Sequence, residues 1–289
     1  MACCKGGTLH NGEAAGREEI MHGINVYVTH PANNVTPKGV VVFISDAFGW
    51  KFINSRLLAD KYAEKGQFLV LIPDFMNGTE MSTATIPVLN AFETPAGWLS
   101  TIFMKPLLAI RIALNGIPFA LQNLSRHHAI MAFIAALRTH EPPFETKNLT
   151  IGVVGFCWGG THAIRLAHDD PGTQVQRHES QITSGKPASL VECAFAAHPS
   201  LLSFPGDVEK VVLPLSVMVG DVDSQLSEEN AWKMKEILEV EKKGAHEVNI
   251  IPGAKHGFAV RMNPANDKEA ANAELAEQQA IDFLTKWLT

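Results

Sequence analysis

The sequence has neither the many cysteines nor the apolar leader that mark small secreted proteins and proteins stabilised by disulfides or bound metal. Its 289 residues include only four cysteines, Cys3, Cys4, Cys157 and Cys193. No two of them have the C-x-x-C spacing typical of a zinc site, so we expect no metal. No apolar segment follows the first residues, which predicts no secretory signal. We therefore expect a cytoplasmic protein with free thiols.

An excess of basic charge is also missing. The 24 lysines and arginines are outnumbered by 30 aspartates and glutamates, which gives a formal net charge of −6. A chain without a basic stripe is a poor nucleic-acid binder, so we expect no nucleic-acid partner. Glycine and proline are near average, which excludes collagen-like and low-complexity classes. A chain of this length can bury a hydrophobic core large enough to be stable without disulfide bonds or bound metal ions.

The sequence has no uninterrupted apolar run long enough to cross a bilayer. A span needs about 20 mostly uncharged apolar residues. The most apolar stretch, residues 102–124, is interrupted by Lys105, Pro106, Arg111, Gly116 and Pro118. We expect no membrane-spanning segment and no membrane partner.

What is present is an alternation of strand and helix patterns. Short apolar runs typical of buried strands lie at 40–45, 68–72, 150–155, 192–197, 215–219 and 246–251. Helical patterns lie at 54–65, 126–139, 161–168, 227–243 and 267–288. This alternation predicts an α/β fold whose mostly parallel sheet is covered by helices on both faces.

Two segments interrupt the alternation. Residues 79–125 are apolar but punctuated by proline and glycine, and we expect helical pieces that form an inserted cap over the sheet edge; ordinary packing is the alternative. Residues 169–190 are polar and predict a surface loop. We expect residues 1–289 to form one domain that contains this cap.

The strongest chemical signal is the run Gly155-Phe-Cys157-Trp-Gly159-Gly160. It follows a buried strand and precedes a helix, the context of a nucleophile elbow. The turn is tight, so glycines must flank the nucleophile. At the helix N-terminus, free N–H groups and the helix dipole favour a thiolate. The alternative is a buried structural cysteine in a glycine-rich turn.

A thiol nucleophile needs a base and an acid that orients it. In α/β-hydrolases these follow the nucleophile in the order acid, then histidine. Asp221 and Asp223 end the strand at 215–219, and His256 follows the last strand. A plain surface histidine is the alternative for His256. The other histidines, His127, His128, His162 and His168 among them, are weaker candidates.

These motifs resemble the dienelactone hydrolase family, of the fungal type. The matching pieces are Gly-Phe-Cys-Trp-Gly-Gly at 155–160, Gly220-x-x-Asp223 and His-Gly-Phe-Ala-Val-Arg at 256–261. Further similar pieces are Cys-Cys-Lys-Gly-Gly at 3–7, Gly-Ile-Asn-Val-Tyr-Val at 23–28, Asp-Ala-Phe-Gly at 46–49 and His-Pro-Ser at 198–200. The resemblance covers nearly the whole chain except 79–125 and 169–190. It implies an α/β-hydrolase fold.

The resemblance also implies roles for residues. Cys157 would be the nucleophile, His256 the general base and acid, and Asp223, rather than Asp221, the acid that orients the imidazole. The backbone N–H groups of Ala47 and Trp158 would form the oxyanion hole. No cofactor is implied. We expect Phe48, His198 and Arg261 to contact the substrate.

Two departures from the family pattern bear on the substrate. Characterised members carry a glutamate where this chain has Asp46, so Asp46 either activates the thiol or caps the following turn. They also carry a substrate-binding arginine after the second strand, which residues 73–78 lack. With Arg261 alone, the demand for a substrate carboxylate is weaker.

The expected substrate is therefore a larger, more apolar ester or lactone. The expected pocket is lined by Phe48, Trp98, Phe103 and Trp158, although each of these is also a common core residue. The expected reaction is hydrolysis through a Cys157 thioester. The alternatives are an acyltransferase or cyclase of a fungal secondary-metabolite pathway, and a non-catalytic binding protein on the same fold. A homodimer is a further expectation.

Overall fold

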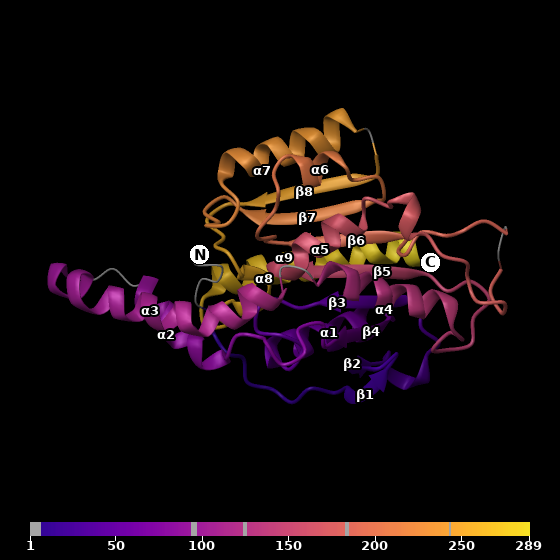
Figure 1. Cartoon of the computed structure of the whole chain (residues 1–289), viewed down its shortest axis with the longest axis horizontal. Helices are drawn as coiled ribbons and strands as arrows, with labels where there is room; N and C mark the ends of the chain where they lie inside the picture. The colour runs from indigo at the N-terminus through magenta and orange to yellow at the C-terminus, as the bar shows by residue number, and fades with distance from the viewer. Residues whose placement is uncertain (1–6, 94–96, 124–125, 183–184, 243) are drawn as a thin grey trace.

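The structure, a computed structural model, describes residues 7–93, 97–123, 126–182, 185–242 and 244–289. Its centre is an eight-stranded sheet in the order β1-β2-β4-β3-β5-β6-β7-β8 (Figure 1). The strands are β1 (Arg17–Met21), β2 (Ile24–Thr29), β3 (Val40–Ile44), β4 (Leu69–Pro73), β5 (Ile151–Phe156), β6 (Cys193–Ala197), β7 (Leu215–Gly220) and β8 (His246–Ile251). The six strands β3 to β8 pair in parallel, and β1 and β2 are antiparallel. The predicted mostly parallel α/β fold is confirmed.

Helices cover the sheet. They are α1 (Ile53–Gly66), α2 (Ile86–Glu93), α3 (Trp98–Asn123), α4 (His127–Thr139), α5 (Trp158–Leu166), α6 (Gly206–Glu209), α7 (Glu228–Lys235), α8 (Phe258–Arg261) and α9 (Asp267–Leu288). On β5, Gly152 faces Leu284 of α9, whereas Gly155 faces the first turn of α5. Residues three apart on a strand point to opposite faces, so α9 and α5 cover opposite sides of the sheet. Both faces are therefore buried, as the apolar strands require.

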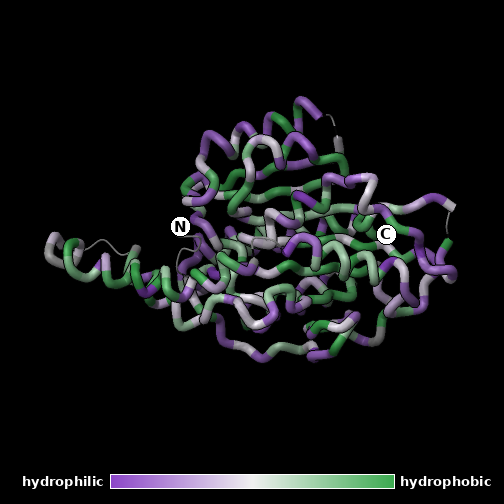
Figure 2. Tube along the Cα trace, in the orientation of Figure 1, coloured by the Kyte–Doolittle hydropathy of each residue, from purple (hydrophilic) through white to green (hydrophobic). Residues whose placement is uncertain are grey.

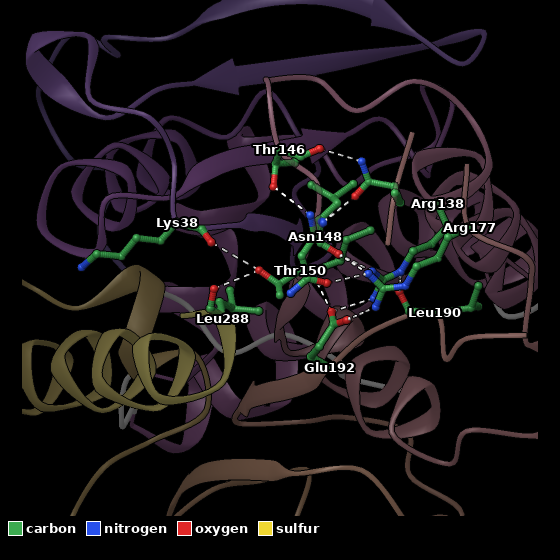
Figure 3. A network of polar contacts seen from close by, with 12 residues as sticks. Lys38, Arg138, Thr146, Asn148, Thr150, Arg177, Leu190, Glu192 and Leu288 are labelled. Carbon is green, nitrogen blue, oxygen red and sulfur yellow. Dashed lines mark hydrogen bonds and ion pairs between the residues drawn. The ribbon is translucent and has the colours of Figure 1, made fainter. Parts of the chain in front are cut away.

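The amino-terminal edge of the sheet is held by a buried arginine network (Figure 3). Arg138 of α4 donates to the backbone oxygens of Leu149 and Leu190 and forms an ion pair of 2.6 Å with Glu192. Glu192 also pairs with Arg177 at 3.1 Å. Each of the three nitrogens of the buried guanidinium thus donates to a partner, and a buried charge requires such partners. The network lies at the amino-terminal ends of β5 and β6. The candidate site forms at the carboxyl-terminal ends of the same strands.

The segment at 79–125 differs from the expected helical pieces. It contains α2 and then α3, a single 26-residue helix with Pro106 and Pro118 inside it. Each proline removes a hydrogen bond to the carbonyl four residues earlier, at Ile102 and Leu114. Those two residues are exposed, so water can solvate the freed carbonyls. Exposure therefore explains why the prolines do not end the helix.

The two ends of α3 lie in different surroundings. Its first half projects away from the body (Figure 1). In its second half, the ring of Phe119 lies 6.1 Å from the ring of Trp158. The expectation that Trp98 and Phe103 line a pocket is wrong, because they lie on the projecting half and are 71% and 68% exposed. The cap role of this segment stays a prediction.

Candidate active site

Five polar side chains follow five neighbouring parallel strands. Asp46 follows β3, Cys157 follows β5, His198 follows β6, Asp223 follows β7 and His256 follows β8. The carboxyl ends of parallel strands meet at one edge of the sheet, which is where α/β proteins bind ligands. All five are buried, and Cys157 is 0% exposed. The topology thus brings together residues as much as 210 positions apart in the sequence.

Cys157 lies on a strained turn between β5 and α5. Its φ of 53° and ψ of −114° place it in a region that non-glycine residues rarely adopt. A β-carbon on Gly159 would overlap the carbonyl of Ile44, and one on Gly155 would overlap the carbonyl of Gly159. The two glycines therefore let the elbow pack directly against β3 and against its own helix. This geometry confirms the turn that the sequence predicted around Cys157.

His256 and Asp223 form a buried pair. The Nδ1 atom of His256 lies 3.0 Å from both carboxylate oxygens of Asp223. Asp223 also accepts a hydrogen bond from the backbone N–H of Gln225. Asp221, the other candidate, instead accepts one from the backbone N–H of Gly253. The structure thus places Asp223, and not Asp221, where it can orient the imidazole.

The two members of this pair stabilise each other's charged form. Burial raises the pKa of Asp223, but hydrogen bonds and the charge of His256 outweigh it, and the pKa is lowered. Burial lowers the pKa of His256, but its interactions with Cys157 and Asp223 raise it to about 9. His256 is therefore an imidazolium at neutral pH when Cys157 carries a negative charge. The electrostatics fit an ion pair between Cys157 and His256.

The raised pKa of His256 predicts a pH-dependent stability. Its folded pKa of about 9 exceeds the ordinary 6.5, so this group's stabilisation is complete below pH 6.5 and is lost as the pH rises through 9. We expect the free energy of unfolding, measured by urea titration, to fall across this window. The Cys157→Ala variant removes the thiolate and should show a shallower fall. Equal slopes for the two proteins would contradict the predicted coupling.

Asp46 and Arg261 form a second buried pair. The guanidinium of Arg261, on α8, donates to the carboxylate of Asp46 and stacks on the ring of Phe48 at 5.4 Å. Asp46 also accepts a hydrogen bond of 3.1 Å from the backbone N–H of Phe48, which is the turn-capping contact that was one of its two expected roles. Burial and the charge of Cys157 raise the pKa of Asp46, and Arg261 opposes them. Arg261 thus contacts both Phe48 and Asp46, and the expected contacts of Arg261 and Phe48 with substrate stay a prediction.

His198 lies behind His256 rather than on an open surface. Its ring is fully buried, 5.1 Å from the ring of His256, and neither of its nitrogens has a hydrogen-bond partner among the residues that the structure describes. Burial lowers the pKa of His198 to about 3, so the ring is neutral. In this arrangement it packs against the imidazole of His256 and the ring of Phe258. A contact with substrate stays a prediction.

Sequence reasoning assigned no role to Ser200. Its Oγ lies 3.5 Å from the Sγ of Cys157, and its backbone N–H donates to the carbonyl of Cys157. The carbonyl of Ser200 accepts from the hydroxyl of Thr161 on α5. The signal that could have found Ser200 is its position just after β6, at the same sheet edge.

Two of the weaker histidine candidates, His162 and His127, pack beside Trp158. The ring of His162 lies 4.4 Å from the ring of Trp158, and the Nδ1 atoms of His162 and His127 are 3.1 Å apart. Burial lowers the pKa of His162 to about 3 and that of His127 to about 4, so both are neutral. Within the described ranges, no group of three or more His, Cys, Asp or Glu side chains is placed to hold a metal ion.

The two residues expected to supply oxyanion donors follow the neighbouring strands β5 and β3. Trp158 is the first residue of α5, and Ala47 follows Asp46 in the turn after β3. Both residues are buried. A cavity of about 370 Å³ borders the site and is lined by His256, Arg261 and Lys255 among others. Cys157 does not line this cavity.

Known proteins of similar sequence and structure indicate the family of this chain. The model of the family described as "Dienelactone hydrolase family" matches residues 24–288. The chain belongs to the dienelactone hydrolase family. A curated relative, hydrolase pyvD of Aspergillus violaceofuscus, is 26% identical over 99% of this chain and 96% of its own length. Hydrolase tropI of Talaromyces stipitatus is 25% identical over 99% of this chain and 94% of its own.

Similar proteins and structures also come from animals and bacteria. The human carboxymethylenebutenolidase homolog is 27% identical over 94% of this chain and 91% of its own length. Among solved structures, a putative dienelactone hydrolase from Klebsiella pneumoniae aligns with a TM-score of 0.54 and 16% identity, covering 99% of this chain and 97% of that one. These matches confirm the α/β-hydrolase fold and a hydrolase of the dienelactone hydrolase family.

Proposed function

We propose that this protein hydrolyses an uncharged ester or lactone through an acyl intermediate on Cys157. The thiolate attacks the substrate carbonyl, and the oxyanion is held by the backbone N–H groups of Ala47 and Trp158. The tetrahedral intermediate collapses, the C–O bond breaks, and the imidazolium of His256 gives its proton to the leaving oxygen. Water then attacks the thioester while His256 accepts its proton. The acid product leaves and the thiolate returns.

The observation that carries the proposal is the placement of Cys157 on a strained elbow next to the buried His256–Asp223 pair. Asp223 accepts from Nδ1, which fixes the ring and directs Nε2 toward the reaction. A purely structural cysteine or a binding protein would not need a buried histidine and carboxylate held in this order. The names of relatives support the substrate class: one in Gibberella moniliformis is called dienlactone hydrolase 1, and animal relatives are carboxymethylenebutenolidase homologs.

The closed site indicates that part of the protein moves. A substrate carbonyl cannot reach Cys157 while its side chain is 0% exposed. The second half of α3 is the segment we assign as the cap, because Phe119 contacts Trp158 directly beside the nucleophile. Movement of this half relative to α5 would open a path to the thiol.

The paired state of Arg261 predicts a preference for neutral substrates. Its guanidinium is already bound to Asp46 in a buried position, so a substrate carboxylate would have to compete with that ion pair. For one lactone with a side chain either free as a carboxylate or capped as a methyl ester, we expect kcat/KM for lactone opening to be at least about tenfold higher for the capped form. A preference for the free carboxylate would contradict this role of Arg261.

Hydrolysis itself is tested by product analysis in oxygen-labelled water. We expect small aryl esters and enol lactones to yield the carboxylic acid with label in its carboxyl group, at a rate that depends on Cys157. Added alcohol or amine acceptors should not divert the acyl group. Transfer to an acceptor with little labelled acid would identify an acyltransferase instead and would overturn the proposal.

A further inference from the structure

The projecting helix α3 exposes one continuous apolar face. The residues of this face recur every three or four positions, which places them on one side of a helix. They are Phe103, Leu107, Ile110, Leu114, Ile117 and Leu121, each between 48% and 78% exposed. The opposite side carries Ile112 and Phe119, which are buried against the protein. Figure 2 shows much of the projecting helix in the green of hydrophobic residues.

The charge of this segment differs from that of the chain around it. The protein has a net charge of −6, yet no aspartate or glutamate occurs between Glu93 and Glu141. Four basic residues do, and Lys105 and Arg111 belong to α3 itself. Neither forms an ion pair with another described residue. A cationic helix with an exposed apolar face complements a surface that is both anionic and apolar.

We propose that α3 binds the surface of a bilayer that contains anionic lipid, with its apolar face buried at the level of the acyl-chain boundary. Arg111 lies at the edge of that face, and its long side chain can reach lipid phosphates. Lys105 lies on the other side of α3, where its ammonium sits over the ring of Phe92 at 5.8 Å, and it adds positive charge to the segment. Trp98, at the projecting end, is 71% exposed and matches the preference of tryptophan for the bilayer interface.

The contacts of α3 favour a position in the plane of the bilayer. Residues 101–122 are long and apolar enough to cross a membrane. A span, however, would pull Ile112 and Phe119 away from the body and place two basic residues inside the hydrocarbon. Lying on the surface keeps both buried contacts. The expectation of no membrane partner rested on the interruptions within residues 102–124, and the continuous helix leads us to replace it.

A second copy of the chain is the competing occupant. The three-and-four spacing is also that of a coiled-coil seam. Two α3 helices would, however, bring Arg111 next to the seam with no acidic residue on either helix to pair with it. Pro106 and Pro118 would also flank the seam. Charge therefore favours the anionic lipid over a second α3.

Vesicle co-sedimentation tests the proposal with the full-length protein. The vesicles contain either phosphatidylcholine alone or equal parts of phosphatidylcholine and phosphatidylserine. We expect binding to the mixed vesicles that weakens with added salt. The double variant Leu107→Glu, Leu114→Glu should lower the affinity at least about tenfold. The double variant Lys105→Gln, Arg111→Gln should also lower it about tenfold.

Matched controls change the same residue types elsewhere on the surface. Val212→Glu with Val240→Glu, and Lys51→Gln with Lys210→Gln, should leave vesicle binding unchanged. All substituted side chains are at least partly exposed, and thermal unfolding checks that each variant is folded.

Equal loss of vesicle binding in the control variants, or no binding of the wild type to mixed vesicles, would overturn the proposal. An oligomer that the Leu107→Glu, Leu114→Glu variant dissociates, without vesicle binding, would assign the face to a second copy. Vesicle binding needs no turnover, so it is independent of the proposed hydrolysis.

Discussion

Cys157→Ala is expected to lower kcat by about 10⁴-fold or more on any ester or lactone that the wild type hydrolyses. Without the sulfur no thioester forms, and only the oxyanion donors and substrate binding remain to accelerate the reaction. Alanine keeps the β-carbon and adopts the same backbone, so the elbow at φ 53° should persist. Steady-state kinetics together with thermal unfolding measure both effects.

Cys193→Ala is the matched control for this prediction. Cys193 is also a buried free cysteine, but it lies within β6, and burial raises the pKa of its thiol. We expect its removal to cost some stability and almost no activity. If both alanine variants lost activity in proportion to lost stability, Cys157 would be a structural residue and the proposed chemistry would fail.

Asp223→Asn is expected to lower kcat by about 10³- to 10⁴-fold while leaving KM nearly unchanged. The asparagine amide cannot stabilise the imidazolium, and it favours the wrong tautomer of His256. Because Asp223 is one of the groups that raise the pKa of His256 to about 9, the variant should also lower that pKa. Steady-state kinetics across pH, with NMR titration of His256, measure the two effects.

Asp221→Asn is the control two residues away. Its Oδ1 accepts from the backbone N–H of Gly253, and an asparagine oxygen can accept the same bond. We expect little change in kcat and no change in the pKa of His256. Equal losses in the two variants would remove the basis for assigning Asp223 as the orienting acid.

Much of the site could be predicted from the sequence because a parallel sheet brings the residues that follow its strands to one edge. Buried parallel strands are continuous apolar runs, and the polar residue after each run must lie at the same sheet edge. The sequence analysis found Cys157 from the elbow motif, and it found Asp223 and His256 from the order of these residues in α/β-hydrolases and from the family resemblance; this rule explains why all three meet. The choice between Asp221 and Asp223 came from a family spacing, and the structure supplies its reason in the 3.0 Å contact to His256.

Features set by contacts between distant segments could not be predicted in the same way. The Asp46–Arg261 pair joins residues 215 positions apart, and nothing local to either one indicates the other. The hairpin of β1 and β2 was also missed, because the edge strand β1 is short and polar. Its turn uses His22 and Gly23, both with positive φ, in place of the usual Asn-Gly.

The helix α3 shows a different limit of sequence reasoning. Prolines and charges within an apolar stretch predict interruption when the local chain is considered alone. In the structure the carbonyls freed by Pro106 and Pro118 lie on an exposed face, so their cost is small and the helix continues. Which face of a helix is solvated depends on its tertiary contacts, and the sequence pattern did not reveal them.

Intact-protein mass spectrometry after rapid acid quench tests the central claim most directly. Wild-type protein, Cys157→Ala and Cys193→Ala are mixed with an aryl ester of a slowly hydrolysed acid. The proposed mechanism predicts a mass increase equal to the acyl group in the wild type and in Cys193→Ala, located on Cys157 by peptide mapping and lost with time. The Cys157→Ala variant should show no adduct, and its turnover should be about 10⁴-fold or more below that of the wild type. Turnover close to the wild-type rate in Cys157→Ala, or an acyl group on another residue, would contradict the account.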